Sequence, residues 1–361
     1  MRIYFVIIGI EILLCFICYL FFRQNFEFAK STKFLLVYVL LAANTIAVRF
    51  LPETMSPFIV RNLAWLNGFW LSWAFYLLLA AIIMLILRGI DHFTNINLPL
   101  SLIASGLLIF SFLFTSWGAY RAMHQDIRTE KIVTEKLPAG EKHKIVFITD
   151  LHLGQMLGRD YAKGLVAKVN ALKPDFILIG GDLLDERISH VNREDSLTPL
   201  KNFQANVGVY MCYGNHDYLD RPELWQKMVE EQGIHILRDQ DVKLDKLKIT
   251  GLNDFSRNRT NDSLIALSKE NKDFYSILLD HQPRKMEIAS EVGYDLYLAG
   301  HTHTGQLWPF RMVTQKLYKL DYGRKSFGDL VAITSNGYGF WGRPVRTEVA
   351  PEYIVIELEG K

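Results

Sequence analysis

Cysteine is scarce in this sequence, with 3 among 361 residues. Cys15 and Cys18 fall within one apolar run and Cys212 within another, so their positions outline no disulfide framework. This scarcity fits a reducing compartment without requiring one. It also argues against sites that need thiolate ligands, such as Cu(I) centres and iron–sulfur clusters.

The sequence also lacks an excess of one charge. It has 40 basic and 38 acidic residues, which gives a formal net charge of +2. Proteins that bind nucleic acid typically carry a clear basic excess. We therefore expect no nucleic-acid partner. Internal repeats and low-complexity tracts are also missing from the sequence.

Charged residues are nearly missing from four long stretches before residue 121. The first stretch contains only Glu11, and residues 34–48, 63–87 and 98–120 contain no charged residue. A helix needs about 20 mainly apolar residues to cross a bilayer, and such runs are too long for core strands. We therefore expect a transmembrane region over residues 1–121. Its four helices are predicted at about residues 3–22, 34–51, 63–87 and 98–120.

The second of these runs is short. It reaches spanning length only if Phe50 and Leu51 are included and if Arg49 and Lys33 extend their charges toward the interfaces. The first run follows Arg2, as the apolar core of a signal peptide would. No small-x-small cleavage site follows it, so we expect a retained anchor.

Glu11 inside the first run is a functional candidate, because a carboxylate within a membrane is costly. A single glutamate without an evident partner is a thin basis for a transport pathway. We therefore interpret the helices as an anchor, or as a platform for a lipid substrate. The sequence does not decide what Glu11 does.

Four spans would place the N-terminus and the C-terminal part of the chain on the same side of the membrane. Basic residues on that side are Arg2, Arg49, Arg61, Arg121 and Arg128, and those on the other side are Arg23, Lys30, Lys33 and Arg88. Basic residues gather on the cytoplasmic side of membrane proteins. The small difference favours the cytoplasmic face for the C-terminal part.

Residues 122–143 are mainly polar and contain Pro138, Ala139 and Gly140 near their end, so we expect a connector with one extended segment. Short apolar runs then alternate with segments of helical periodicity. The runs are "KIVFITD", "DFILIGGD", "VGVYMCYGNHD", "FYSILLDHQP" and "YDLYLAGHTH". Continuous apolar runs of this length suit strands that are buried on both faces. This alternation predicts an α/β domain over residues 144–361.

Each of the five runs ends in residues that can bind a metal ion. In α/β sheets, sites form where loops leave the carboxyl ends of the strands. Taken singly, each residue has a structural alternative: a turn former, a helix cap or a loop histidine. Five such ends in series instead predict one joint metal site. The residues are Asp150, His152, Asp182, Asn215, His216, His281, His301 and His303.

The ligand types restrict the metal. Carboxylate, imidazole and amide oxygen suit Mn²⁺, Fe²⁺ or Zn²⁺. There are too many ligands for one ion, so we expect two divalent ions that share one carboxylate. Such a pair can share a hydroxide and stabilise the attacking and leaving oxygens of an in-line displacement. This chemistry suits the hydrolysis of phosphoesters.

The order Asp-x-His, Gly-Asp, Gly-Asn-His-Asp, His and Gly-His-x-His resembles that of the calcineurin-like metallophosphoesterases, over roughly residues 144–361. The ending "SNGYGFWGRPVRTEVAPEYIVIEL" is similar to that of the bacterial membrane-associated branch, which implies a multi-pass protein of a bacterial cell membrane. The resemblance implies an α/β/β/α fold with two packed β-sheets flanked by helices.

The resemblance also implies a role for each residue. One ion would be held by Asp150, His152 and His303, and the other by Asn215, His281 and His301. Asp182 would bridge the two ions. His216 would lie near the leaving group as an acid or electrostatic stabiliser, and Asp217 would orient the ring of His216.

The region around the last two histidines raises three expectations. His301 and His303 would point the same way from an extended backbone, so that each reaches one ion. Thr304 departs from the branch, which usually has glycine there, and threonine is a poor residue for a positive φ. Trp308 and Phe310 are either ordinary packing or an apolar lip that receives a lipid tail.

We therefore predict a membrane-anchored phosphoesterase that hydrolyses a lipid-linked or membrane-proximal phosphoester or pyrophosphate. One alternative is a soluble nucleotide or cyclic nucleotide as substrate, and another is a metal-bearing sensor or scaffold that regulates the membrane region. Two sets of basic residues have two possible roles: they bind a phosphate headgroup, or they are solvated loop charges. The sets are Arg257 with Arg259, and the basic residues of segment 311–325. The ligands do not distinguish monoesters from diesters, and the sequence sets neither the native metals nor the oligomeric state.

Overall fold

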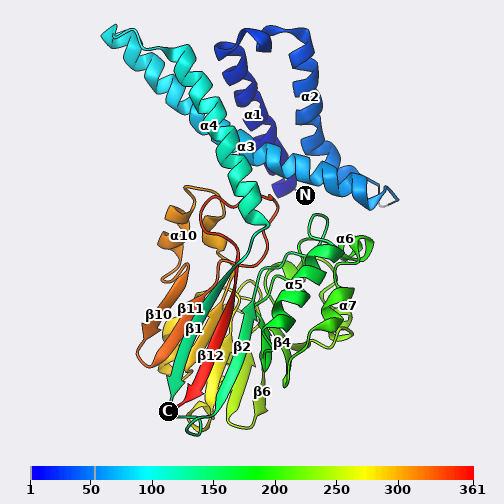
Figure 1. Ribbon diagram of the computed structural model, residues 1–361, viewed down its shortest axis with the longest axis vertical. Coiled ribbons are helices and arrows are strands. Elements are labelled where there is room, and N and C mark those ends of the chain that lie inside the picture. The colour runs from blue at the N-terminus through cyan, green and yellow to red at the C-terminus, as the bar shows by residue number, and fades with distance from the viewer. Residues whose placement is uncertain (1, 53) are drawn as a thin grey trace. The chain divides into compact units, whose positions relative to one another are not determined.

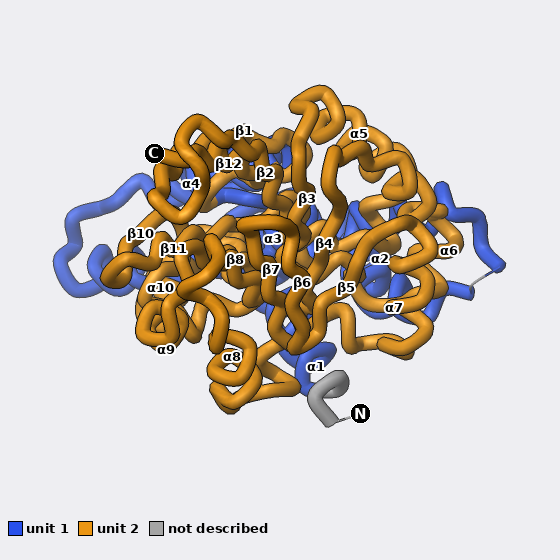
Figure 2. The backbone as a smooth tube through the Cα atoms, turned by 90° about the horizontal axis from the view of Figure 1, so that it is seen from below, with its two compact units in different colours: residues 1–121, 342–347 blue, residues 122–341, 348–361 orange. Residues whose placement is uncertain are grey.

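A computed structural model of the protein describes residues 2–52 and 54–361, without the side chains of residues 2–5. The chain divides into two compact units, which are coloured separately in Figure 2. The membrane unit consists of residues 1–121 and 342–347, and the α/β unit consists of residues 122–341 and 348–361. The expected fold class, apolar helices followed by an α/β domain, is confirmed.

Four helices among the described residues are long and apolar enough to cross a membrane (Figure 1). They are α1 (Arg2–Asn25), α2 (Thr32–Ala47), α3 (Pro57–Thr94) and α4 (Leu100–Ala122). Helix α2 changes at Ala47 into the short 3₁₀ helix η2 (Val48–Phe50), near the end expected for the second span. Helix α3 has 38 residues, more than the roughly 20 that a bilayer requires, so only part of it crosses the apolar layer.

The helices of the membrane unit pack through an aromatic core. Tyr38 contacts the ring of Trp70 at 5.5 Å between centroids, and its hydroxyl donates to the carbonyl oxygen of Cys15 at 2.6 Å. Glu11 has a partner that the sequence did not reveal, because its Oε1 lies 2.7 Å from Nη2 of Arg49. A paired carboxylate is far less costly within a membrane than an isolated one.

The segment 342–347 belongs to the membrane unit although it lies far from the four helices in sequence. A Cβ at Gly68 of α3 would meet Cδ of Pro344 at 2.4 Å, and a Cβ at Gly118 of α4 would meet Cγ1 of Val345 at 2.7 Å. The backbone N–H of Arg346 donates to the carbonyl oxygen of Gly118 at 2.9 Å. The two glycines therefore make room for this segment against the helices.

Two six-stranded sheets make up the α/β unit, whose residues are all described. The first has the order β1 (Asp126–Thr134), β12 (Glu352–Gly360), β2 (Lys142–Ile148), β3 (Phe176–Ile179), β4 (Gly208–Cys212), β5 (His235–Leu237). The second has the order β10 (Gly323–Phe327), β11 (Leu330–Thr334), β9 (Leu296–Ala299), β8 (Tyr275–Leu279), β7 (Leu247–Gly251), β6 (Gln240–Leu244).

Strand β1 changes our interpretation of residues 122–143 as a connector. It pairs in parallel with β12 along its whole length, from Asp126 opposite Glu352 to Thr134 opposite Gly360. The polar alternation of β1 reflects its position at the edge of the sheet, where half of its side chains face solvent. This stretch therefore forms part of the α/β unit.

The two sheets pack face to face. Phe147 and Leu178 of the first sheet share one apolar core with Ile277 and Leu298 of the second. The outer face of the first sheet is covered by α5 (Arg159–Ala171), α6 (Ile188–Glu194) and α7 (Pro222–Glu230), and that of the second by α8 (Asp262–Leu267) and α9 (Met286–Glu291). The layers are therefore α/β/β/α, as expected (Figure 2).

The sheet topology determines where the site lies. Strands β2, β3 and β4 run parallel to one another in the first sheet, and β8 and β9 run parallel in the second. Parallel neighbours end at the same edge of a sheet, so the loops after them converge. These five strands carry the five apolar runs of the sequence.

Candidate metal centre

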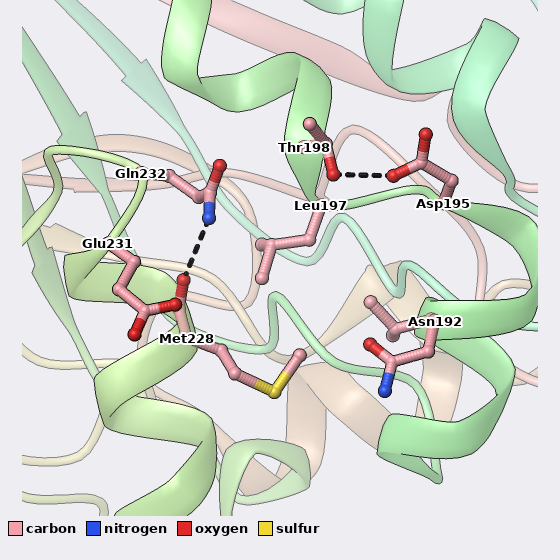
Figure 3. A pocket seen from close by; sticks show the side chains of 8 residues that line it. Asn192, Asp195, Leu197, Thr198, Met228, Glu231 and Gln232 are labelled. Atoms are coloured by element: carbon pink, nitrogen blue, oxygen red, sulfur yellow. Dashed lines mark hydrogen bonds between the residues drawn. The ribbon is translucent and has the colours of Figure 1, made fainter.

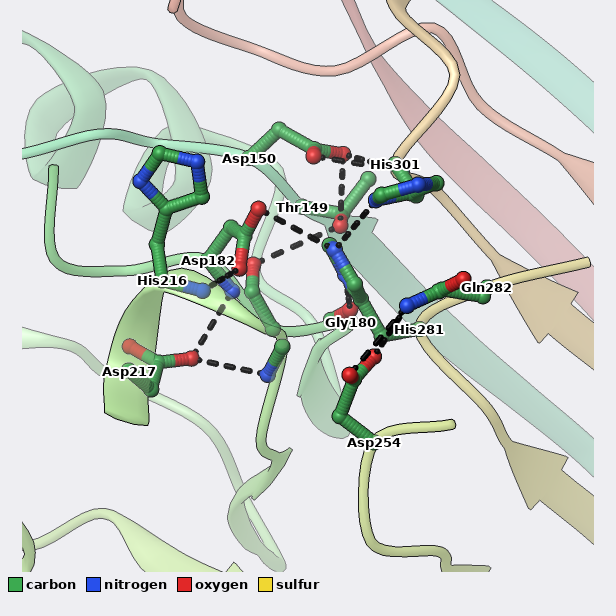
Figure 4. A network of polar contacts seen from close by, with 12 residues as sticks. Thr149, Asp150, Gly180, Asp182, His216, Asp217, Asp254, His281, Gln282 and His301 are labelled. Carbon is green, nitrogen blue, oxygen red and sulfur yellow. Dashed lines mark hydrogen bonds and ion pairs between the residues drawn. The ribbon is translucent and has the colours of Figure 1, made fainter. Parts of the chain in front are cut away.

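The expected ligands lie in the loops that follow these five strands (Figure 4). The structure brings their side chains into three overlapping groups in which the ligand atoms lie within 4.8 Å of one another. The groups are Asp150, His152 and His303; His152, Asp182 and His216; and Asp182, His281 and His301. The first and the third correspond to the two predicted ion sites.

In the first group, Nε2 of His303 lies 3.3 Å from Oδ1 of Asp150. Nε2 of His152 lies 3.0 Å from Nε2 of His303. The three side chains are buried, and they converge from the loops after β2 and β9.

In the third group, Nε2 of His281 lies 3.1 Å from Oδ2 of Asp182 and 3.2 Å from Nδ1 of His301. The other ring nitrogen of His281, Nδ1, donates to the carbonyl oxygen of Gly180 at 2.8 Å. This hydrogen bond fixes the tautomer and leaves the lone pair of Nε2 for a metal ion.

Asp182 links the two groups through one oxygen. Its Oδ2 lies 3.1 Å from Nε2 of His281 and 3.9 Å from Nε2 of His152. Its Oδ1 accepts a hydrogen bond of 2.8 Å from the backbone N–H of His216. The carboxylate is therefore held with one oxygen between the two groups.

The donor set fits a pair of divalent cations. A cation fits between two imidazole nitrogens that face each other beside buried carboxylates. Neutral imidazole together with carboxylate is a common ligand set for Mn²⁺, Fe²⁺ and Zn²⁺. Oδ1 of Asn215 is buried without a hydrogen-bond partner, so a metal ion would satisfy it. The residues expected to hold two ions therefore have the geometry and the open ligand atoms to do so.

Five of the seven expected ligands have a positive φ, between 46° and 72°: Asp150, His152, Asp182, His301 and His303. Such conformations cost about 1–3 kcal/mol each in non-glycine residues and concentrate at functional sites. Our expectation of an extended backbone at His301 and His303 is wrong, because both lie in a turn after β9. The turn still directs one imidazole to each group. Thr304 also has a positive φ, of 50°.

Backbone approaches the ligands closely at two glycines. A Cβ at Gly300 would lie 2.3 Å from Oδ2 of Asp150, and a Cβ at Gly214 would lie 2.2 Å from Oδ1 of Asp182. Neither contact is sterically tolerable. Both glycines are therefore required for the positions of the two carboxylates.

The hydrogen bonds of Asp217 differ from those we expected. Its carboxylate accepts hydrogen bonds from Nε1 of Trp225 and from the backbone N–H groups of Asp182, Leu183, Leu184 and Gly214, at 2.8–3.1 Å. It does not orient the ring of His216. It instead fixes the loops that carry Asp182 and Asn215.

The ring of His216 is held by Asp185, a residue that our sequence analysis missed. Nδ1 of His216 donates to the carbonyl oxygen of Asp185, and Oδ1 of Asp185 lies 3.4 Å from Nδ1 of His152. The centroids of the His216 and His152 rings are 4.7 Å apart. Asp185 lies three residues after Asp182 in the same loop, which was the only available signal.

Asp254 is a second residue that sequence reasoning missed. It is fully buried, and its carboxylate accepts from Nε2 of Gln282 at 2.9 Å and from the backbone N–H of Ser256 at 2.8 Å. Gln282 follows the ligand His281 directly. Asp254 therefore fixes the loop after β8 from the side opposite Asp182 (Figure 4).

Burial and the mutual proximity of these groups shift their pKa values. Burial would raise the pKa of Asp150, but His303 and the other imidazoles outweigh it and hold that pKa below its usual range. Burial lowers the pKa of His301 to about 4, and the neighbouring His281 adds to this effect. Burial and, second to it, the charge of Asp182 raise the pKa of Asp217 to about 6. Ionised carboxylates and a neutral His301 are the forms that bind a metal ion.

A separate surface pocket lies between α6, η3 (Thr198–Asn202) and α7 (Figure 3). It is lined by Val191, Asn192, Asp195, Leu197, Thr198, Met228, Glu231 and Gln232. None of the expected site residues lines it. The candidate metal ligands therefore lie at the strand ends and not in this pocket.

Comparison with known proteins gives a consistent result. Residues 143–305 match the family model described as calcineurin-like phosphoesterase. An uncharacterized metallophosphoesterase of Helicobacter pylori is 34% identical over 241 residues. The match covers 65% of this chain and 64% of that protein, so this chain spans slightly less than two thirds of that relative. One from Aquifex aeolicus is 30% identical over 262 residues, which are 69% of this chain and 99% of that protein. A Danio rerio transmembrane protein with metallophosphoesterase domain is 30% identical over 248 residues, which are 63% of this chain and 56% of that protein.

Proposed function

Because the chain belongs to the calcineurin-like metallophosphoesterase family, we propose that it is a membrane-anchored enzyme that hydrolyses a lipid-linked or membrane-proximal phosphoester or pyrophosphate with two divalent metal ions. The single observation that carries this proposal is the position of Asp182. One oxygen of its carboxylate lies within 3.9 Å of imidazoles from both ligand groups. A bridging carboxylate is what a two-ion site requires.

We assign one ion to Asp150, His152 and His303 and the other to Asn215, His281 and His301, with Asp182 shared. The donor set favours Mn²⁺, Fe²⁺ or Zn²⁺. Ions in such a site polarise phosphoryl oxygens and supply a nucleophile from water at neutral pH. The chain contributes by fixing the ligands, through Gly180 at His281 and through Asp217 at the loop of Asp182.

We assign His216 to the leaving group. Its Nδ1 is occupied by the carbonyl oxygen of Asp185, so Nε2 is the atom that can give a proton to the departing oxygen. Its ring forms the second of the three groups with His152 and Asp182, and this group is neither of the two predicted ion sites. This position suits a residue that touches the substrate and not the ions.

Two arginines close to the site support an anionic substrate. The guanidinium of Arg257 lies 4.8 Å from the ring centroid of Tyr218, and that of Arg284 lies 4.7 Å from that of Tyr318. Tyr218 follows His216 by two residues, and Arg284 follows His281 by three. Arginine held on an aromatic ring is well placed to bind phosphate oxygens.

The four apolar helices are the reason for proposing a substrate at the membrane. A site that remains close to a bilayer encounters phosphoesters of lipids at high local concentration. We propose a bacterial cell membrane, with the N-terminus and the α/β unit on the cytoplasmic side. A scaffold without activity would tolerate the loss of a ligand, whereas this chain retains each ligand that the family motif requires.

The proposal is tested by metal content and hydrolysis together. Full-length protein in detergent would be analysed by metal mass spectrometry and assayed with bis-p-nitrophenyl phosphate and p-nitrophenyl phosphate, before and after chelation. We expect about two ions per chain. In Asp182→Ala we expect fewer ions and turnover lower by at least about 10²-fold.

The control is Asp160→Ala, which removes an exposed carboxylate from the first turn of α5. It should retain both the ions and the activity. If the wild-type protein held no ion and hydrolysed neither ester after incubation with Mn²⁺, Fe²⁺ and Zn²⁺, the proposal would be wrong.

A further inference from the structure

An exposed apolar surface follows the turn that carries His303. Helix α10 (Arg311–Leu317) has no buried residue, and its three large apolar side chains are open to solvent. The exposed fractions are 64% for Met312, 50% for Val313 and 59% for Leu317. Trp308 and Phe310 extend this surface toward the turn, with 51% and 42% exposed. We name these five residues the α10 surface.

The arrangement of the α10 surface is that of an interfacial helix. Phe310, Val313 and Leu317 are spaced by three and four residues, so they share one face of the helical turn. Contiguous exposed apolar side chains on a folded protein mark an interaction site or a membrane contact. At least half of each of the Met312, Val313 and Leu317 side chains is exposed to solvent.

The basic residues of the segment that carries this surface fit an anionic lipid interface. Residues 307–320 contain Arg311, Lys316 and Lys319 and no acidic residue. Arg311 and Lys319 pair with Asp321 and Glu287, whereas Lys316 is exposed on the helix. Apolar side chains alternating with basic ones, and a tryptophan at the edge, are typical of helices that lie in the headgroup region of a bilayer.

The turn before the α10 surface is bonded to the residue at which the chain leaves the α/β unit. Gln306, two residues before Trp308, makes two hydrogen bonds of 3.0 Å with the backbone of Trp341. Trp341 is followed directly by Gly342, where the chain enters the membrane unit. Four described helices of the same chain are long and apolar enough to cross a membrane, so a bilayer is an apolar phase that this chain can meet.

The α10 surface is also tied to the metal centre. Thr302, between the two ligand histidines, donates from Oγ1 to the carbonyl oxygen of Asp321 at 2.7 Å. The carboxylate of Asp321 in turn accepts from Nε of Arg311 and from Oγ1 of Thr314, at 3.4 and 3.0 Å. The position of α10 is therefore coupled to the turn that presents His301 and His303.

We propose that the α10 surface docks on the lipid bilayer and inserts Met312, Val313 and Leu317 at the boundary between headgroups and acyl chains. Side chains of such helices reach about 5–10 Å into the interface. This contact fixes the turn of His301 and His303 at the membrane surface. It is a property of the surface itself and does not depend on which phosphoester the centre hydrolyses.

The test measures lipid contact at one residue of the full-length protein. The native cysteines Cys15, Cys18 and Cys212 are buried, so a thiol-reactive nitrobenzoxadiazole dye would report the introduced cysteine of Met312→Cys. The protein would be reconstituted, one copy per nanodisc, in phosphatidylcholine and phosphatidylglycerol with doxyl-labelled lipid as quencher. We expect blue-shifted emission and loss of fluorescence to the doxyl lipid.

Two further variants make the result decisive. Ile265→Cys places the dye on α8, where the native side chain is 47% exposed, and should give solvent-like emission without quenching by lipid. Adding Val313→Asp and Leu317→Asp to Met312→Cys should abolish the quenching, because charged side chains are expelled from the apolar layer. Lipid quenching that persisted in this triple variant would overturn the proposal.

Two other outcomes would also overturn it. Solvent-like emission at Met312→Cys would show that the surface faces water. A blue shift that lacks lipid quenching and appears only at several copies per vesicle would assign the surface to a second copy of the chain. None of these outcomes requires a hydrolysis assay, so each one tests the α10 surface independently of the proposed function.

Discussion

The carbonyl oxygen of Asp185 accepts a hydrogen bond from Nδ1 of His216. A carbonyl group can only accept, so the hydrogen on the ring must be on Nδ1, and Nε2 is left for another partner. This contact fixes the ring beside the metal ligands without using its second nitrogen. His216 is thereby prepared to exchange a proton with a group that enters the site.

Replacing His216 with alanine should therefore separate catalysis from metal binding. We expect His216→Ala to keep both ions and to lower turnover by about 10²–10⁴-fold on esters with poor leaving groups, the usual effect of lost acid–base assistance. Esters of nitrophenol, a good leaving group, should be affected less. The matched control is His235→Ala, which removes an exposed histidine at the start of β5. Loss of an ion in His216→Ala would mean that this residue is a ligand.

Asp217→Ala should reduce stability before it changes chemistry. The substitution leaves backbone N–H groups of Asp182, Leu184 and Gly214 buried without an acceptor. We expect a loss of about 3 kcal/mol in the free energy of unfolding, because each unsatisfied buried donor costs about 1–3 kcal/mol. Asp217→Asn, which keeps one acceptor oxygen, should lose less. Thermal unfolding in detergent and metal content would measure both. If Asp217→Ala kept its stability but changed the pH profile of turnover, Asp217 would instead act by orienting the ring of His216.

Gly214→Ala should displace the shared carboxylate. The added Cβ would lie 2.2 Å from Oδ1 of Asp182, so one of the two groups must move. We expect lower metal content and turnover lower by about 10²-fold, as for loss of one strong electrostatic contact. In the control Gly164→Ala, at an exposed position of helix α5, no atom lies within 4 Å of the added Cβ. It should raise stability by about 0.5–1 kcal/mol. Normal metal content in Gly214→Ala would contradict this view of the site.

The ion pair between Glu11 and Arg49 predicts an effect on stability. Glu11→Leu leaves the charge of Arg49 without its partner at 2.7 Å. Removing one member of a buried pair costs about 3–5 kcal/mol, whereas replacing both by apolar residues is often neutral. We therefore expect Glu11→Leu/Arg49→Leu to be more stable than Glu11→Leu. Unfolding in detergent measures this, with hydrolysis as the second readout. Unchanged stability with reduced turnover in Glu11→Leu would instead indicate a functional carboxylate.

The sequence predicted which of these side chains lie close together, because the physical cause is local. Buried strands read as apolar runs, and the residue after a run must lie at the edge of the sheet, so Asp150, Asp182 and His281 could be placed together. The expected fold class was confirmed for the same reason. The alternation of short strands and helices leaves few arrangements open.

What the sequence could not reveal depends on contacts between distant segments. The carboxylate of Asp217 is adjacent to His216 in the chain, but its hydrogen bonds go to a loop more than thirty residues earlier. The polar strand β1 resembles a connector until β12 is seen beside it. The positive φ of His301 follows from how the turn closes over Asp150, whose carboxylate accepts from the backbone N–H of His301 at 3.0 Å. None of these contacts produces a periodic pattern in the amino-acid sequence.

The segment 342–347 has a consequence for handling the protein as separate parts. Because of it, the polypeptide passes between the two units at three points, after residues 121, 341 and 347. A truncation that begins at Ala122 would remove the notches at Gly68 and Gly118 that receive Pro344 and Val345. The freed loop ends five residues before β12 begins, and it starts three residues after Gly339, whose N–H bonds the carbonyl oxygen of Asp150. The helices thus supply the surface against which residues 342–347 fold, and removing them leaves this segment without its packing partners.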